Sequence, residues 1–259
     1  MRLAMGIEYD GRSFFGWQFQ KERASVQQVV EQAISFVANT TLNVVCAGRT
    51  DTGVHAVEQV IHFDTEVQRD EYSWLKGTNA NLPKSVSVLW VKQVNEAFHA
   101  RFKAERRRYR YVIFNREVRP AFLAGRVSWE YRDLDETKMQ AAANTLLGEH
   151  DFSAYRTVAC QAKSPVRNLM RLEVTRSNEL IFLDVEANAF LHHMVRNLAG
   201  VLMTIGAGEQ PINWAWDVLQ SRDRRSGGIT APPGGLYLMK IDYPVEFDLP
   251  ESVSSSAVW

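Results

Sequence analysis

The chain has 259 residues, of which 46% are hydrophobic and 23% are charged. These proportions are typical of a globular protein with a substantial core. Thirty Lys and Arg balance thirty Asp and Glu, so nucleic-acid binding has to come from local clusters of basic residues. No apolar run approaches the roughly 18 residues of a membrane helix, and charged residues come too early for a signal peptide. We therefore expect a cytoplasmic protein that has no membrane partner.

The chain has two cysteines, Cys46 and Cys160. Neither lies in a CxxC pair or at a spacing from histidine that is typical of a zinc site, and a disulfide framework is not expected from two cysteines so placed. We expect two reduced thiols and no bound metal.

The first half of the chain alternates strand and helix patterns. Apolar residues alternate along 3–9, which predicts a strand. Ser25 is expected to cap a helix, because Gln28 three residues later completes a capping-box pattern and apolar residues recur beyond it at helical spacing. Two short strands, a helix and a further strand are expected at 42–46, 60–63, 70–78 and 86–94.

The second half repeats this order. Alternation along 109–113 predicts a strand, and Asp135 precedes a helix with an apolar stripe. Two strands are expected at 170–174 and 181–185. Asn188 is expected to cap a helix that extends to Ile205, and the last strand is expected at 236–243.

Both halves thus have the order strand-helix-strand-strand-helix-strand, which is the ferredoxin-like order. We predict an α+β fold in which two such βαββαβ halves, residues 1–104 and 105–247, share a mostly antiparallel sheet with flanking helices. Residues 248–259 form a tail, and 252–259 lack periodicity and are expected to be mobile.

A polar loop between two predicted strands is the most informative segment. It has the sequence Cys-Ala-Gly-Arg-Thr-Asp-Thr-Gly-Val-His-Ala at 46–56. Its two glycines permit a tight path and the close approach of other groups, and between them lie Arg49 and Asp51. Asp51 is either a turn aspartate that hydrogen-bonds its own backbone or a catalytic carboxylate.

The same loop contains Asp51-Thr52-Gly53, which matches the Asp-Thr-Gly of aspartic proteases. Those enzymes need two such carboxylates that share one proton, and the tripeptide occurs once here. A neighbouring arginine favours an ionised aspartate, and the expected helices disagree with an all-β protease. We therefore set the protease hypothesis aside.

A basic and aromatic segment extends from Phe98 to Tyr111. Cations that contact phosphates and rings that stack on bases are typical of proteins that bind single-stranded or looped RNA. The alternative is a solvated basic edge strand, but the clustering of arginine with tyrosine favours RNA. The predicted RNA-binding residues are Arg101, Arg106, Arg107, Arg108 and Arg110, and the aromatic residues of the segment include Phe102, Tyr109 and Tyr111.

A third polar segment lies at 188–197. His192 and Arg196 are four residues apart and are expected on one face of the helix, whereas the adjacent histidines point in directions that suit one metal poorly. We expect Arg196 to be a buried cation that pairs with a carboxylate, with Asp51 as a candidate. The alternative is a surface arginine, but Gly200, one turn further on, favours close packing.

Two other loops are less specific. The polar loop 155–164 contains arginine, lysine and glutamine, which is equally typical of an RNA contact and of a mobile surface loop. The sequence Pro-Pro-Gly-Gly at 232–235 predicts a turn that enters the last strand.

Taken together, these segments resemble the TruA family of tRNA pseudouridine synthases. They follow the family order over nearly the whole chain, and Thr52, where the family usually has alanine, is one departure. The matching segments are Gly-Ile-Glu-Tyr-Asp-Gly at 6–11, Phe-Gly-Trp-Gln at 15–18, Asn-Ala-Asn-Leu-Pro at 79–83 and Gly-Leu-Tyr-Leu at 235–238, together with 47–56, 98–102, 108–111 and 187–197.

The resemblance implies that Asp51 is the catalytic aspartate, that Tyr109 lies on the target base, and that Arg196 pairs with the aspartate. Arg49 resembles the family arginine that helps to open the stem and hold the flipped nucleotide, and Leu236 resembles the apolar wall of the pocket. The family is homodimeric, uses no metal or organic cofactor, and modifies uridines 38, 39 and 40 of the tRNA anticodon stem-loop. We expect the RNA to bind in a cleft between the two halves.

Pseudouridine formation breaks the N1–C1′ bond of uridine, turns the uracil and rejoins it through C5, without oxidation or reduction. A carboxylate such as Asp51 can attack the sugar, promote departure of the base, or attack the uracil ring, and the sequence leaves these routes open. A non-catalytic RNA-binding module is the alternative function. It explains the basic segment but not the joint match of Asp51, Tyr109 and Arg196.

Overall fold

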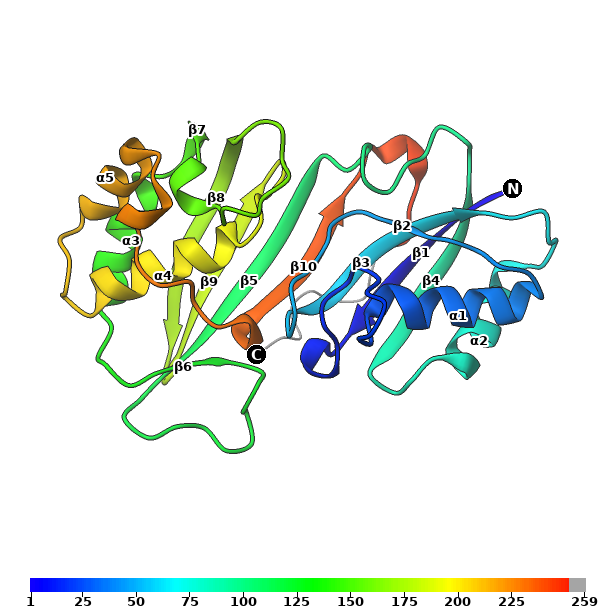
Figure 1. The fold of residues 1–259 in the computed structure, drawn as a ribbon, viewed down its shortest axis with the longest axis horizontal. Coiled ribbons are helices and arrows are strands. Elements are labelled where there is room, and N and C mark those ends of the chain that lie inside the picture. Colours follow the sequence, from blue (N-terminus) through cyan, green and yellow to red (C-terminus); the bar gives the residue numbers. More distant parts are fainter. Residues whose placement is uncertain (252–259) are drawn as a thin grey trace. The chain divides into compact units, whose positions relative to one another are not determined.

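A computed structural model describes residues 1–251, and the predicted mobile segment 252–259 lies outside the described residues. The chain forms two compact units (Figure 1), one made of Met1–Glu105 and the described residues from Tyr237 on, the other of Arg106–Leu236. The positions of the two units relative to one another are not determined. Both units combine helices with mostly antiparallel strands, which confirms the predicted α+β class.

The sheet of the first unit has β1 (Arg2–Tyr9) between two antiparallel neighbours, β3 (His55–Asp64) and β4 (Val86–Val94). Strand β3 also pairs with the short β2 (Val45–Cys46) and, in parallel, with β10 (Leu236–Asp242). The predicted strand at 60–63 is therefore much longer than expected. It begins at His55, directly after the Asp51 loop.

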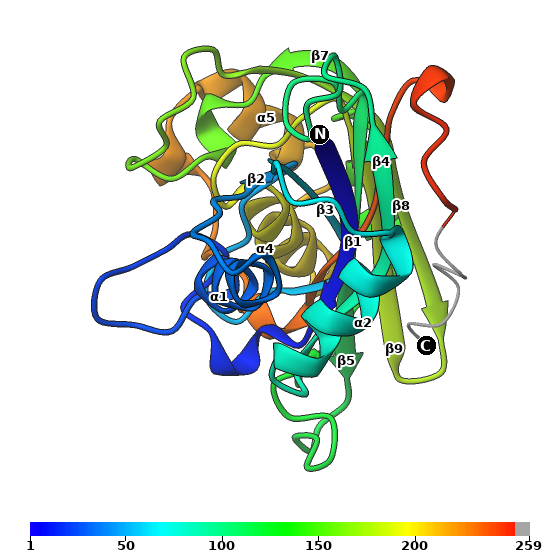
Figure 2. The ribbon, with the colours of Figure 1, turned by 90° about the vertical axis from the view of Figure 1, so that its right-hand side faces the viewer.

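Two helices of the first unit, α1 (Val26–Ala38) and α2 (Glu71–Asn81), pack against each other (Figure 2). The hydroxyl of Ser25 accepts the backbone N–H of Gln28 at 3.3 Å, which confirms the predicted N-cap. The Asp70 side chain caps α2 in the same way, through the N–H of Ser73 at 2.7 Å. Both helices thus begin where a short side chain supplies the missing acceptor.

The second unit has an antiparallel sheet in the order β5 (Arg106–Asn115), β9 (Leu180–Ala187), β8 (Val166–Ser177) and β7 (Gly148–Asp151). The short β6 (Ser128–Glu130) lies parallel to β5. Helix α3 (Glu136–Asn144) packs on β8 and on α4 (Met194–Gly206), and α5 (Trp214–Ser221) packs on both helices (Figure 1). Short 3₁₀ helices lie at Gly11–Ser13, Ser153–Tyr155, Arg224–Ser226, Pro233–Gly235 and Val245–Phe247.

The prediction that Asn188 caps a helix is wrong. The helix begins at Met194, after His193 in the left-handed conformation with φ of 64°. The side-chain oxygen of Asn188 instead accepts the backbone N–H groups of Asn168 and Ala189, at 3.1 and 2.9 Å. Asn188 therefore fixes the end of β9 against β8, and His192 does not share a helix face with Arg196.

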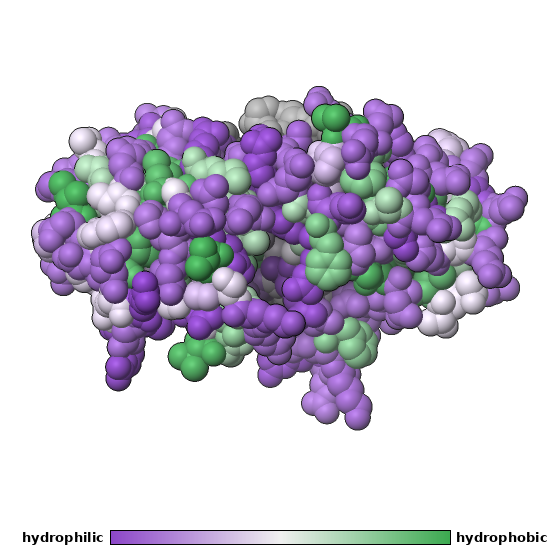
Figure 3. Space-filling model, turned by 90° about the horizontal axis from the view of Figure 1, so that it is seen from above, coloured by the Kyte–Doolittle hydropathy of each residue, from purple (hydrophilic) through white to green (hydrophobic). Residues whose placement is uncertain are grey.

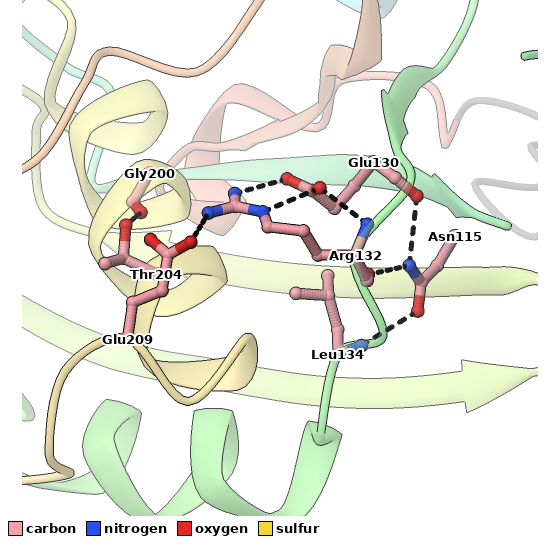
Figure 4. A network of polar contacts seen from close by, with 7 residues as sticks. All are labelled: Asn115, Glu130, Arg132, Leu134, Gly200, Thr204 and Glu209. Atoms are coloured by element: carbon pink, nitrogen blue, oxygen red, sulfur yellow. Dashed lines mark hydrogen bonds and ion pairs between the residues drawn. The ribbon is translucent and has the colours of Figure 1, made fainter. Parts of the chain in front are cut away.

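A polar network joins β6 and the segment that leads to α3 with β5 and the end of α4 (Figure 4). Arg132 contacts the carboxylates of Glu130 and Glu209, at 2.6 and 2.7 Å. The Asn115 amide donates to the carbonyls of Glu130 and Arg132, at 3.0 and 2.7 Å, and accepts the N–H of Leu134 at 3.2 Å. Burial opposes ionisation of Glu130, but the hydrogen bonds from Arg132 outweigh it and hold the pKa of Glu130 below its ordinary value.

The Arg132→Met substitution is expected to lower the free energy of unfolding by about 2–4 kcal/mol, because it leaves the carboxylate of Glu130 buried without its cation. Arg225→Met is the matched control. It breaks an ion pair with Asp223 that is exposed to solvent, so we expect a change below about 1 kcal/mol. Urea unfolding at pH 7 measures both changes, and equal effects would contradict the network's role.

None of the helices in residues 1–251 is both long enough and apolar enough to span a membrane. Polar residues cover most of the face of each unit that Figure 3 shows, with apolar residues scattered among them. Scattered exposed apolar residues are usual on a protein in water.

Candidate active site

The Asp51 loop follows a path that two glycines outside it make possible. A Cβ atom on Gly11 would lie 2.0 Å from the carbonyl oxygen of Val54, and one on Gly16 would lie 2.7 Å from that of Thr50. Gly16 also has a φ of +85°, which side chains rarely adopt. The 11–16 segment therefore lies directly on the backbone of the loop. No local pattern in the sequence indicates this contact.

Hydrogen bonds hold both sides of the same loop. The side chain of Gln59, on β3, accepts the N–H of Gly48 at 3.3 Å and donates to its carbonyl at 2.5 Å. The Thr50 hydroxyl shares a buried hydrogen bond of 2.7 Å with the Tyr9 hydroxyl, and the Thr50 carbonyl accepts the N–H of Trp17 at 3.0 Å. The backbone before Asp51 is thus fixed by hydrogen bonds to residues of β3, of β1 and of the segment after β1.

Within this frame Asp51 and its polar neighbours Arg49 and Thr52 differ in exposure. Asp51 is half-buried, whereas Arg49 and Thr52 are exposed. The Asp51 carbonyl accepts the N–H of Val54 at 3.1 Å, and Gly53 turns the chain with a φ of 78°. The loop thus holds the partly accessible carboxylate of Asp51, and the long, exposed side chain of Arg49 lies two residues before it.

His55 closes the loop and was given no role from the sequence. Its ring is buried and stacks on Tyr237, with centroids 4.7 Å apart. Its Nδ1 accepts the N–H of Gly11 at 3.1 Å and lies 3.4 Å from the Asp10 carboxylate. His55 therefore ties the loop to the end of β1 and to β10.

In the second unit, Tyr109 lies on β5 opposite Val185 and is only 8% exposed. Its ring and that of Phe190 form a T-shaped pair, with centroids 5.0 Å apart and an interplanar angle of 82°. Edge-on packing against a second ring restricts how Tyr109 can turn.

Arg196 is half-buried on α4 and is fixed by the segment that precedes β10. Its Nε donates to the Ala231 carbonyl at 2.8 Å, and the Ala231 N–H donates to the Arg196 carbonyl at 3.1 Å. A Cβ on Gly200 would lie 1.9 Å from the Ile229 carbonyl oxygen, which confirms the close packing predicted from this glycine.

The same segment continues onto β5. The Tyr111 hydroxyl donates to the Pro232 carbonyl at 2.8 Å, and a Cβ on Gly235 would lie 2.5 Å from the carbonyl oxygen of Val112. Leu236 follows and is buried. Residues 231–236 therefore connect the helix of Arg196 with the strand of Tyr109. Asp51 belongs to the first unit, so its pairing with Arg196 stays a prediction.

Arg101 lies on a turn of the first unit that two histidines stabilise. His62 Nδ1 accepts the N–H of Ala100 at 3.1 Å, and His99 Nδ1 accepts the N–H groups of Arg101 and Phe102 at 3.2 Å. The Phe102 ring stacks on His99 with centroids 4.3 Å apart. Burial, followed by the charges of His99 and Arg2, lowers the pKa of His62 to about 4.

The free energy of unfolding is expected to fall by about 2 kcal/mol between pH 7 and pH 5 through His62. The unfolded chain protonates this histidine near its ordinary pKa of 6.5, whereas the folded protein does so only near 4. The stabilisation is therefore present above pH 6.5 and is lost as the pH falls toward 4. His62→Gln, which does not titrate, should flatten the dependence by this amount, and an unchanged slope in urea unfolding would exclude His62 as its source.

The arginine run on β5 is divided between the two faces of the strand. Arg106 and Arg108 contact the Glu186 carboxylate, both at 3.2 Å. Arg110 contacts both oxygens of Asp184, at 2.8 and 2.9 Å. Carboxylates of β9 thus compensate part of the positive charge on this face. Whether these arginines bind RNA stays a prediction.

The two cysteines are free thiols, as predicted. Burial raises the pKa of Cys46 to about 12, so this thiol stays protonated at neutral pH. A protonated thiol is a poor nucleophile, and Cys46 beside the Asp51 loop is therefore a packing residue.

Comparison with known proteins identifies the family of this chain. The family model described as "tRNA pseudouridine synthase" matches residues 5–103 and 142–244. The protein called tRNA pseudouridine synthase A from Nitrosococcus oceani is 58% identical over 259 residues, which cover all of both chains. The proteins of that name from Pseudomonas aeruginosa and Coxiella burnetii are 55% and 52% identical, over 96% of this chain and 88% and 95% of their own. The chain belongs to the tRNA pseudouridine synthase family.

One solved structure shows a more distant likeness. A chain of the entity titled "Crystal Structure of a Cbf5-Nop10-Gar1 Complex" aligns with 91% of this chain and 57% of its own length, at 11% identity and a TM-score of 0.38. A likeness at this level supports no statement about function.

Proposed function

We propose that this protein isomerises uridine to pseudouridine in tRNA, at positions 38, 39 and 40 of the anticodon stem-loop. The observation that carries the proposal is the match to tRNA pseudouridine synthase A relatives over the whole chain, combined with a rigid loop that holds a half-buried Asp51. The reaction breaks N1–C1′, forms C5–C1′, and moves a hydrogen from C5 to solvent while N1 gains one. Because nothing is oxidised or reduced, it consumes no cofactor.

Asp51 is the proposed nucleophile. A carboxylate can attack C1′ and hold the sugar as a covalent intermediate, as in a retaining glycosidase. It can also promote departure of the base or add to the uracil ring, and each of these routes uses the ionised form. The hydrogen bonds around Thr50 and Gly48 support the proposal, since a catalytic group has to be held within a fraction of an ångström of its working position.

The other roles follow the same assignment. Tyr109, restrained by Phe190, stacks on the target base, and Leu236 forms the apolar wall beside it. Arg196 pairs with Asp51 and orients it through its planar guanidinium. The exposed Arg49 holds the flipped nucleotide, which has to leave the helical stack at a cost of a few kcal/mol.

We also propose that each half follows the ferredoxin-like plan. The first unit supports this, because its elements run β1-α1-β2-β3-α2-β4 and its strands lie in the order β4-β1-β3-β2. In the chain order of the second half, β5, α3, β8, β9, α4 and β10 occupy the corresponding places. The proposed working form is a homodimer in the cytoplasm.

The proposal is tested with unmodified tRNA transcripts that carry a single uridine at position 38, 39 or 40. After incubation with the full chain and no added metal, pseudouridine-specific chemical labelling should mark that position in each transcript. Transcripts with cytidine at all three positions are the control. Labelling that does not exceed the no-enzyme sample in any transcript would overturn the proposed activity.

A further inference from the structure

Two arginines of the second unit form no ion pair with a carboxylate of the described residues. Arg156 follows the 3₁₀ helix at Ser153–Tyr155, and Arg167 lies on β8 opposite His150. Neither forms an ion pair within residues 1–251. The charge of Arg156 contributes to lowering the pKa of Asp151. The Asp151 carboxylate, however, accepts the N–H of Ser153 at 2.9 Å and lies 3.6 Å from Arg222.

Arg167 is held in place by backbone carbonyls rather than by an acid. One guanidinium nitrogen donates to the carbonyls of Ser164 and Val166, at 3.0 and 2.6 Å. Its Nε is buried and has no hydrogen-bond partner within the described residues. A buried donor without an acceptor costs about 1–3 kcal/mol, which indicates a group that a ligand completes.

A third cation is close to these two. Burial lowers the pKa of Arg167, and the charges of Arg107 and Arg156 lower it further. Arg107 donates to the carbonyl of Asn188 at 2.7 Å, and it lies two residues before Tyr109, hence on the same face of β5 and about 7 Å from it. The charges of Arg107 and Arg156 thus both act on Arg167, and Arg107 belongs to the strand that carries the proposed base-stacking residue.

The backbone around the three arginines is tied together across separate segments. The N–H of Thr157 donates to the His192 carbonyl at 3.1 Å, which joins the Arg156 segment to the loop before α4. Asn188 joins that loop to β8 through the N–H of Asn168. Hydrogen bonds therefore fix the segments that carry Arg156 and Arg167. On the other face of β5, the carboxylates of Glu186 and Asp184 compensate part of the charge of the remaining arginines.

We propose that Arg156 and Arg167, beside Arg107, bind a phosphodiester of the tRNA backbone next to the target nucleotide. The inference rests on the proposed function, which supplies the RNA. A guanidinium group can bind phosphate oxygens through two parallel hydrogen bonds. A bound phosphate would supply the acceptor that the Arg167 Nε lacks and a negative charge beside Arg156 and Arg167.

The test compares the full-length wild-type protein with Arg156→Gln, Arg167→Gln and the double variant. Affinity for an unmodified tRNA transcript is measured between about 50 and 300 mM salt. Each lost phosphate contact should weaken binding about 5-fold near physiological salt and make the salt dependence shallower by about 0.7–0.9 log units per log unit of salt. Arg171→Gln is the matched control, because Arg171 lies on the same strand but pairs with Glu173, and its slope should stay at the wild-type value.

Stability separates this role from a structural one. Arg156→Gln, which removes a charge that repels Arg167, should leave the melting temperature unchanged or raise it, whereas loss of a structural arginine would lower it. A wild-type slope in the double variant, while the wild-type protein forms pseudouridine, overturns the phosphate site and leaves the proposed function standing. A shallower slope together with no pseudouridine from the wild type supports the site and overturns the activity. If inorganic phosphate at constant ionic strength stabilises the wild type but the double variant keeps the wild-type slope, the ligand is free phosphate and the RNA assignment is overturned.

Discussion

The Asp51→Asn variant is expected to bind tRNA with wild-type affinity and to form no detectable pseudouridine. Asparagine has nearly the shape of aspartate, so the loop fixed by Thr50 and Gln59 should keep its path. The amide is neutral and is not a nucleophile, and loss of the principal catalytic group typically lowers kcat by about 10⁴-fold or more. Single-turnover incubation with excess enzyme, followed by chemical labelling of pseudouridine, separates the loss of chemistry from a loss of binding.

Thr52→Ala is the matched control for this variant. Thr52 is the next residue of the same loop, its side chain is exposed, and alanine is the residue that the sequence resemblance leads us to expect there. We expect the wild-type rate within about twofold. A large loss in Thr52→Ala would show that the assay reports any disturbance of the loop rather than the carboxylate.

The Gly16→Ala variant, in which the Asp51 side chain is unchanged, is expected to have a kcat about 10²-fold lower than the wild type. Its Cβ would meet the Thr50 carbonyl oxygen at 2.7 Å and the Asp51 carbonyl carbon at 3.1 Å. The loop has to move to make room, and a displacement near 1 Å of a catalytic group costs about this factor. Steady-state kinetics on a tRNA transcript measure it, with tRNA affinity expected to change little.

Gly208→Ala isolates the backbone contribution to that effect. Gly208 has a φ of +74°, close to the +85° of Gly16, but an added Cβ would meet no atom within 4 Å. Both variants should lose about 1–2 kcal/mol of unfolding free energy from the positive φ alone, and Gly208→Ala should keep its activity. Equal kinetic losses in the two variants would mean that contact with the Asp51 loop is not the cause.

Local signals in the sequence predicted much of the fold. The serine before α1 accepts a backbone N–H group, as predicted. The helices predicted at 70–78 and after Asp135 are also present, and the aspartate before each accepts a backbone N–H group. These elements carry a start signal and a regular apolar pattern within the same few residues. Gly200 likewise predicted close packing, because a glycine inside an otherwise apolar helix indicates an approaching backbone.

Features that depend on tertiary contacts could not be predicted in this way. Helix α4 begins at Met194 and not after Asn188, because the Asn188 side chain accepts the N–H of Asn168 on β8. No local pattern shows this contact. The short β6 and β7 have too few residues for a periodic signal. For the candidate site, the chain indicated Asp51 and Tyr109 but neither the glycines beneath the loop nor the carboxylates that pair with alternate arginines of β5, since register decides those contacts.

The most direct test of the central claim follows the hydrogen that the reaction must release. A tRNA transcript labelled with tritium at C5 of uridine loses that tritium to water only when C5 becomes bonded to C1′. The wild-type protein should release the label from positions 38, 39 and 40 to completion, and Asp51→Asn should release none above the no-enzyme control. Release by Asp51→Asn at the wild-type rate would contradict the assignment of Asp51 as the catalytic carboxylate.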